Sequence, residues 1–164
     1  MKPTSRPAQR QSLAGVRLRK HADYQRAYAS ARKRQSASMS WFFAPQSLVH
    51  PAVASDHPEA AVPSHLPIGP RVGLTVGKVM GKATERNRIK RRMREALRRH
   101  VDMLPQGFDL IFHPRRIVLT MDFMQLEAEI VRILQQAHEL ISTEAARMVK
   151  LPVPAPDSAA KPAS

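Results

Sequence analysis

The stretch from Gly81 to Arg99 reads GKATERNRIKRRMREALRR. From Arg86 to Arg99 it holds eight Lys and Arg side chains against a single acid, Glu95. Its apolar residues recur at helical spacing, so they share one face, and the cations take the remaining faces. The stretch therefore predicts a helix that packs through a narrow apolar face and offers the rest of its surface to a polyanion.

The helical projection assigns each side chain of this stretch to a face. The apolar arc consists of Ile89, Met93, Ala96, Leu97 and His100, and the stripe opposite it of Asn87, Arg91, Arg94 and Arg98. Beside the stripe lie Arg88 and Arg99, while Lys90 and Arg92 flank the apolar edges. Arg86 projects over the apolar side, so we expect it either to extend past the end of the sheet or to reach a carboxylate or a carbonyl. A merely solvated charged face is disfavoured, because like charges four residues apart repel.

The composition also favours nucleic acid as partner. The 164 residues carry 27 Lys and Arg against 13 Asp and Glu, a net charge of +14 with a pI near 11.3. Such a surplus of positive charge destabilises a compact chain by self-repulsion. A purely structural role does not require this surplus, so the charge points to an anionic partner. Cysteine is absent, which excludes disulfides and thiolate metal sites. No apolar run approaches the ~20 residues of a membrane span, so we expect a cytoplasmic protein with no membrane partner.

Composition further divides the chain. Residues 1–17 are basic and predict a flexible arm, and residues 18–148 predict a single RNA-binding domain. Residues 45–70 contain six prolines and neither Lys nor Arg, which predicts a mobile loop within that domain. Residues 149–164 are rich in Pro and Ala and predict a disordered tail.

Between these segments the hydrophobic periodicities predict an α+β layer fold. Tyr24, Ala27, Tyr28 and Ala31 follow the spacing of one helical face. Alternating residues predict strands at 39–44, 71–76 and 109–113, with Met39, Trp41 and Phe43 on one side of the first. A last helix is expected from Asp122, where Asp122 and Gln125 have capping-box spacing.

Three motifs now resemble the signature of the protein subunit of bacterial ribonuclease P. They are Thr75-Val76-Gly77-Lys78, Gly81-Lys82-Ala83, and Arg86-Asn87-Arg88-Ile89-Lys90-Arg91 with Arg94-Glu95. Asp23-Tyr24 with Tyr28, the strand from Arg71 to Leu74, and Asp109 to Phe112 followed by Arg115 also look like that family. The resemblance leaves out the two ends of the chain and the Pro-rich loop.

The resemblance implies a fold and a function. The fold is a small two-layer α/β sandwich with a mixed sheet, like the second domain of ribosomal protein S5. Its basic helix is joined to the neighbouring strands by a left-handed βαβ crossover. The function is to assist a catalytic RNA that removes the 5′ leader of precursor tRNA by endonucleolytic cleavage. The basic helix contacts the catalytic RNA, and a cleft between the leading helix and the sheet holds the single-stranded leader.

The implied site residues fall into two groups. Those expected to bind the catalytic RNA are Arg86, Asn87, Arg88, Lys90, Arg91, Arg94 and Arg98. Those expected to bind the leader are Tyr24, Tyr28, Phe42, Arg71, Lys78 and Arg115. Phe43 is an alternative to Phe42, because a shift of one residue exchanges the faces of a strand. The two tyrosines have an alternative role as core residues of an amphipathic helix.

The sequence contains no catalytic constellation of its own. Neither a Ser-His-Asp set nor paired carboxylates share a predicted face. His50, His57 and His65 with Asp56 match no common metal spacing. We therefore expect no catalytic residue, no metal ligand, no tightly bound cofactor and no small-molecule substrate in the protein. The Mg²⁺ that the reaction needs is expected on the RNA partner, and precursor tRNA is the second partner.

Two other functions remain open from the residues alone. In the first, the basic helix enters the major groove of DNA, although it lacks the heptads of a dimeric basic zipper. In the second, the protein clamps a structured RNA during ribosome assembly, with no connection to tRNA ends. Neither alternative predicts an effect on the removal of tRNA leaders.

Overall fold

The computed structural model describes residues 12–46 and 69–149. The main part of the Pro-rich loop, the tail after Val149 and the first eleven residues lie outside this range, so the expectations for them stay predictions. The confirmed class is α+β: four strands form one mixed sheet, accompanied by helices α1 (His21–Ser30), α2 (Ala83–Arg99) and α3 (Phe123–Val149).

The sheet has the order β1-β2-β4-β3. Its strands are β1 (Arg32–Gln35), β2 (Met39–Pro45), β3 (Arg71–Leu74) and β4 (Phe108–Pro114). β2 pairs antiparallel with β1 and β4, whereas β3 pairs parallel with β4. The chain runs from β3 through α2 to β4, which is the helical crossover that a parallel pair requires.

The main core lies between the sheet and the helices α2 and α3. Met39, Trp41 and Phe43 of β2 point into it, as their alternation predicts, and Phe43 is 2% exposed. Four residues of the predicted apolar arc are buried and form the packing face of α2, namely Ile89, Met93, Ala96 and Leu97. His100, the fifth, follows the helix and bonds Glu127 of α3 at 2.9 Å. From α3 the buried residues are Leu126, Ile130, Ile133, Leu134 and Ala137. Asp122 caps this helix, accepting a hydrogen bond of 2.8 Å from the backbone N–H of Met124.

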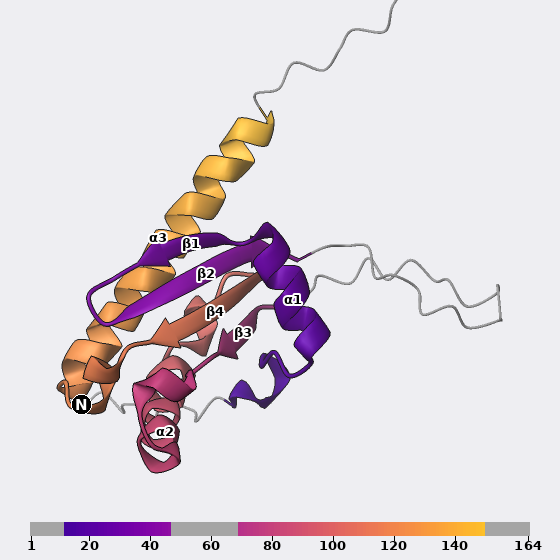
Figure 1. Cartoon of the computed structure of the whole chain (residues 1–164). Helices are drawn as coiled ribbons and strands as arrows, with labels where there is room; N and C mark the ends of the chain where they lie inside the picture. The colour runs from indigo at the N-terminus through magenta and orange to yellow at the C-terminus, as the bar shows by residue number, and fades with distance from the viewer. Residues whose placement is uncertain (1–11, 47–68, 150–164) are drawn as a thin grey trace, which may run out of the picture.

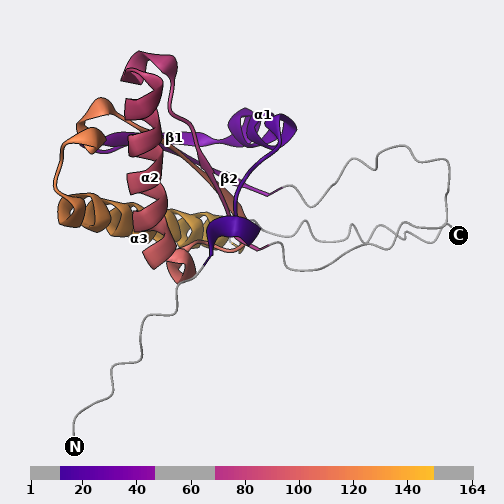
Figure 2. The same cartoon turned by 90° about the horizontal axis from the view of Figure 1, so that it is seen from below.

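Helix α1 covers the opposite face of the sheet at one end, and Figure 2 shows α1 and α3 on opposite sides. A smaller apolar cluster of Leu18, Ala27, Ala44 and Ile111 holds it there. The remainder of this face stays open to solvent and carries side chains of alternate residues in each strand. Helix α3 continues past the sheet (Figure 1), and its Glu144 accepts a 3.0 Å hydrogen bond from Arg32 at the start of β1.

The structure corrects the prediction of a flexible arm over residues 1–17, as far as it describes that segment. Leu13 begins a short 3₁₀ turn, η1 (Leu13–Gly15), and is 8% exposed in the main core. The backbone of Val16 and Leu18 then bonds to Val72 of β3. Residues 12–17 are thus part of the folded domain, because β3 offers a free edge to which they bind.

Candidate nucleic-acid interface

The turn before α2 fixes where the basic helix begins. Gly81 has a φ of 125°, a left-handed conformation that favours glycine. The Glu85 carboxylate folds back beneath it and accepts a 2.8 Å hydrogen bond from the backbone N–H of Lys82. The other oxygen of Glu85 accepts from Arg116 at 2.9 Å. One acid therefore closes the first turn of α2, where negative charge also complements the helix dipole.

Two arginines of α2 are used inside the protein. Arg86 donates to the carbonyl of Gly81 at 3.0 Å, as expected for a cation that projects over the apolar side. Arg92 donates to the carbonyls of Leu119 and Met121, which ties α2 to the segment before α3. These guanidinium groups satisfy backbone acceptors and hold α2 in place.

The last turn of α2 holds a local ion-pair group. Glu95 accepts hydrogen bonds from Arg98, at 2.8 Å to each oxygen, and from Arg99 at 3.3 Å. Arg98 lowers the pKa of Glu95 first of all by hydrogen bonding, and Arg99 adds to the effect, so the carboxylate stays charged. Arg99 also pairs with Glu127 of α3 at 3.2 Å. Of the residues expected to bind RNA, Arg98 is thus engaged with an acid of its own helix.

Five further polar side chains of α2, some in the predicted stripe and some beside it, have no partner inside the described protein. Within residues 12–46 and 69–149, no hydrogen bond or ion pair engages the side chains of Asn87, Arg88, Lys90, Arg91 and Arg94. A groove beside α2 is lined by Asn87, Arg88 and Arg91, with Phe123 of α3 at its edge. Arg88 and Arg91 are exposed, and Lys90 and Arg94 are half-buried, so the cationic face lies away from the apolar face as the sequence projection predicts.

Three rings form an aromatic cluster on the open face of the sheet, namely Tyr28, Phe42 and His113. The ring centroids lie 5.3 Å apart for Tyr28 and Phe42, 5.8 Å for Tyr28 and His113, and 4.9 Å for Phe42 and His113. Tyr28 is 37% exposed, so the cluster is accessible to a ligand. The alternative that placed Phe43 on this face is excluded, because Phe43 lies in the main core.

His113 was not among the predicted site residues. The hydroxyl of Tyr28 lies 2.6 Å from His113 Nε2. Burial lowers the pKa of His113, and the charge of Lys33 lowers it further, which favours the neutral ring. Burial also raises the pKa of Tyr28, so its hydroxyl stays protonated, and the hydroxyl and the neutral imidazole share one hydrogen bond whose direction is set by the imidazole tautomer. The period of two along β4 could have identified it, since His113 shares the face of Ile111.

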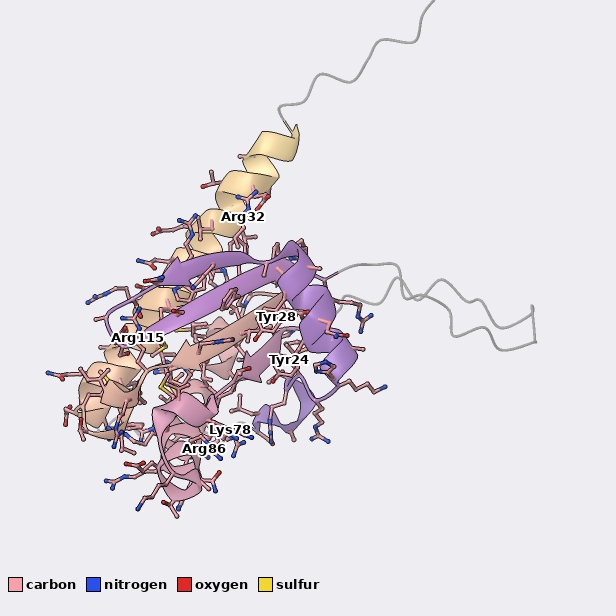
Figure 3. The ribbon with its side chains drawn as sticks, in the orientation of Figure 1. Tyr24, Tyr28, Arg32, Lys78, Arg86 and Arg115 are labelled. Carbon is pink, nitrogen blue, oxygen red and sulfur yellow. The ribbon has the colours of Figure 1, made fainter. Side chains whose placement is uncertain are left out.

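Tyr24 lies beside the cluster, with its ring centroid 6.4 Å from that of Tyr28, but it has a structural role (Figure 3). Its hydroxyl accepts a 3.2 Å hydrogen bond from the backbone N–H of Leu74 and lies 3.4 Å from the carbonyl of Leu18. The ring lies against Gly73, where an added Cβ would come within 2.8 Å of it. Glycine at position 73 therefore lets Tyr24 join α1 to the edge of β3.

The structure also gives Arg71 an internal role. Its guanidinium donates to both oxygens of Asp109 at 2.8 Å, and it lies 3.7 Å from Asp23 of α1. Asp109 is 3% exposed, and a buried carboxylate is costly without a cation beside it. Arg71 is thus engaged away from the aromatic cluster, contrary to its expected place among the leader-binding residues.

Two further predicted cations lie at the ends of their strands (Figure 3). Lys78 is exposed in the 3₁₀ turn η2 (Lys78–Met80), which follows β3. Arg115 follows β4 and is exposed, and it donates to the side-chain oxygen of Gln35 at 3.2 Å. Arg115 is two residues after His113, which belongs to the aromatic cluster. The structure therefore brings together Tyr28 and Phe42 with His113, and sets Lys78 and Arg115 at strand ends.

Residues 12–46 and 69–149 contain no group of three or more His, Asp or Glu side chains placed to hold a metal ion. His50, Asp56, His57 and His65 lie outside the described residues. Of the helices in the described ranges, none combines the length and the apolar content needed to span a bilayer.

The fold and the site together define a small basic α+β protein that presents a cationic helix face and, on another surface, a cluster of rings. A family model described as "Ribonuclease P" matches residues 14–138. The ribonuclease P protein component of Synechococcus sp. is 33% identical over 129 residues, which cover 78% of this chain and 86% of that protein. The chain belongs to the family of ribonuclease P protein components, which acts in tRNA processing.

Other relatives match over shorter stretches. The ribonuclease P protein component of Chloroflexus aggregans is 44% identical over 77 residues, or 46% of this chain. The match spans 57% of that relative's length, and 54% for the component of Herpetosiphon aurantiacus. Among solved structures, the RNase P protein of Thermotoga maritima shares 24% identity with a TM-score of 0.55, over 73% of this chain and 96% of that one. That likeness supports the fold.

Proposed function

We propose that this chain is the protein subunit of ribonuclease P, binding the catalytic RNA through α2 and the 5′ leader of precursor tRNA through the aromatic cluster. In this role it assists the endonucleolytic removal of the leader, which leaves the mature 5′ end of the tRNA. Its place of action is then the cytoplasm. Family membership supports the assignment, and the two separate surfaces supply a physical basis for two RNA contacts.

The observation that carries the proposal is the outward stripe of α2. Arg88, Arg91 and Arg94 present guanidinium groups that no acid among the described residues neutralises. Guanidinium forks match pairs of phosphate oxygens, and Asn87 adds a neutral donor and acceptor. A folded RNA, recognised by its shape and backbone, fits such a cationic surface.

The aromatic cluster suits the leader. Unpaired bases stack on aromatic rings at ~1 to 3 kcal/mol per base, and stacking tolerates any base. Tyr28 and Phe42 provide the platform, His113 orients the Tyr28 hydroxyl, and Lys78 and Arg115 are cations for the leader's backbone. A subunit that processes many precursor tRNAs needs this tolerance, because their leaders differ in sequence.

The protein has no chemical step of its own in this proposal. Mg²⁺ held by the RNA partner would supply the chemistry, by activating the attacking water and stabilising the leaving oxygen. The protein reduces the repulsion between two polyanionic RNAs and adds contacts to the substrate's leader. Both effects raise the affinity for precursor tRNA and lower the concentration of Mg²⁺ that the reaction needs.

The proposal is tested by reconstitution with the cognate catalytic RNA. We expect the purified full-length chain to stimulate leader removal from precursor tRNA at low Mg²⁺ concentration, with a smaller effect at high Mg²⁺. A variant with Arg88, Arg91 and Arg94 replaced by alanine serves as the control and should stimulate weakly. An unchanged cleavage rate with the unmodified chain across the Mg²⁺ range would exclude the proposed role.

A further inference from the structure

The segment from Ser12 to Arg19 is fixed against the edge of the sheet. The backbone N–H of Val72 donates to the carbonyl of Val16 at 2.6 Å, and the N–H of Leu18 donates to the carbonyl of Val72 at 2.9 Å. These bonds place the segment along β3, parallel to it. Leu13 anchors the preceding turn in the main core. The backbone that carries Arg17 and Arg19 is therefore held in one position.

A groove runs between this segment and α2, and we call it the N-terminal groove. Arg17 and Arg19 line one wall, and Arg91, Arg94 and Arg98 line the other. Figures 1 and 2 show η1 beside α2. The acid in its lining is Glu95, which Arg98 and Arg99 already bond. Five guanidinium groups thus converge on one concave surface.

Glu95 compensates Arg98, and the other four guanidinium groups of the groove form no ion pair in the described part of the chain. Arg19 donates to the carbonyl of Ala14 at 3.3 Å, and its charge stays unpaired. Arg17, Arg91 and Arg94 form no ion pair with any acid in residues 12–46 and 69–149. Like charges on facing walls repel, and a concave surface strengthens the local potential. Such a groove attracts anions.

The N-terminal groove continues the cationic surface of α2. Arg91 and Glu95 belong to its lining and also to the groove on the other side of α2, where Arg88 and Asn87 lie. The two grooves therefore meet across the helix. A single small anion would occupy one point of this surface, whereas a chain of phosphates can follow it from Arg88 to Arg17.

We propose that the N-terminal groove binds the phosphodiester backbone of the same RNA that α2 binds, with Arg17 and Arg19 as phosphate-contacting residues. The inference rests on the proposed function, under which that RNA is the catalytic RNA of ribonuclease P. It extends the RNA footprint from one helix to a surface made by two segments about 70 residues apart in sequence. Because the segment is pinned to β3, these arginines bind with little loss of backbone entropy.

The test is the salt dependence of binding between the full-length chain and the catalytic RNA. We expect Arg17→Ala with Arg19→Ala to weaken binding roughly tenfold near 0.1 M salt, and to lower the slope of log K against log salt by about 1.4 to 1.8, the value for two lost phosphate contacts. Arg17→Lys with Arg19→Lys should restore the slope, because lysine keeps the charge. The lysine variant also reports on the groove should the alanine variant fold poorly.

The matched control is Arg34→Ala with Arg132→Ala, which removes two exposed charges from β1 and α3 near the opposite edge of the sheet. If the control variant loses as much of the salt slope of RNA binding, net charge and not the N-terminal groove causes the effect, and the proposal is overturned. A loss confined to precursor tRNA, with the catalytic RNA bound normally, would also overturn it. If the unmodified chain fails to bind the catalytic RNA, the proposed function itself is wrong, which is a distinguishable result.

Discussion

Two tyrosines one turn apart on α1 differ in what their hydroxyl groups do. Tyr28 bonds His113 and keeps its ring accessible, whereas Tyr24 bonds the backbone of β3. We predict that Tyr28→Ala lowers the affinity for leader-bearing precursor tRNA about 5- to 150-fold, the equivalent of one lost stacked base. Affinity for leaderless tRNA should stay unchanged. Equilibrium binding of the two RNAs to the holoenzyme measures the difference.

Tyr24, one helical turn before Tyr28, provides the control for the prediction on Tyr28. Tyr24→Phe keeps the ring against Gly73 and removes the acceptor for the N–H of Leu74, so the free energy of unfolding should fall by about 1 to 3 kcal/mol. Denaturant titration measures this fall. The ratio of affinities for leader-bearing and leaderless RNA should not change. A selective loss of leader binding in Tyr24→Phe would contradict the structural role that its contacts indicate.

Individual residues also mark the limit of prediction from sequence. The period of two placed Phe42 on the correct face, and the helical projection placed Arg88 and Arg91 outward. Arg71 was misplaced because its partner, Asp109, is 38 residues away and adjacent only through strand pairing. The period of two along β4 assigns His113 to the face of Ile111, but the rings of Tyr28 and Phe42 that contact it come from α1 and β2. Local periodicity predicts a face, whereas partners across the sheet depend on tertiary pairing.

Among the elements, α2 contains adjacent arginines with different functions. Arg91 faces outward, and Arg92 donates to the carbonyls of Leu119 and Met121. We predict that Arg91→Ala lowers the salt slope of RNA binding by about 0.7 to 0.9. Arg92→Ala removes the same charge one residue away and should leave the slope unchanged while lowering stability. Equal slopes for the two variants would mean that net charge, not the outward face, governs binding.

The hairpin of β1 and β2 is fastened to α3 by Glu129. This carboxylate accepts hydrogen bonds from the hydroxyl of Ser36, from the backbone N–H of Ser38 at 3.0 Å and from its hydroxyl at 2.5 Å. Burial opposes the charged form, but these hydrogen bonds together outweigh burial and lower the pKa of Glu129 below its ordinary value of 4.5. The charged carboxylate therefore stabilises the folded hairpin.

We predict that Glu129→Gln lowers the free energy of unfolding at pH 7 by about 1 to 2 kcal/mol, a modest value because the group is partly exposed. A pKa lowered by folding stabilises the protein above the ordinary carboxyl pKa, and that contribution is lost as the pH falls through the folded value. The difference between the two proteins should thus be full at pH 7 and shrink below pH 4.5. Denaturant titrations across this range measure it, and a constant difference would contradict the assignment.

Strand β1 is the strand that the sequence pattern does not predict. It reads RKRQ, all four side chains are exposed, and no apolar alternation marks it as a strand. The residues of β1 have a low strand propensity, and the strand is stabilised instead by its pairing with β2 and by the ion pair between Arg32 and Glu144. Charged residues on an edge strand also discourage pairing with other chains. Elements that contribute a hydrophobic face were predicted well, and this edge element contributes almost none.

At the scale of the whole molecule, the net charge of +14 opposes folding through self-repulsion. The repulsion is concentrated where α2 and the N-terminal groove face solvent, and anions that bind only the folded chain stabilise it by mass action. We predict that sulfate raises the midpoint of thermal unfolding more than chloride does at equal ionic strength. The alanine variant at Arg17 and Arg19 should lose part of this extra stabilisation, whereas the control variant at Arg34 and Arg132 should retain it. Equal responses to both salts in the unmodified chain would indicate general screening and would contradict localised anion binding.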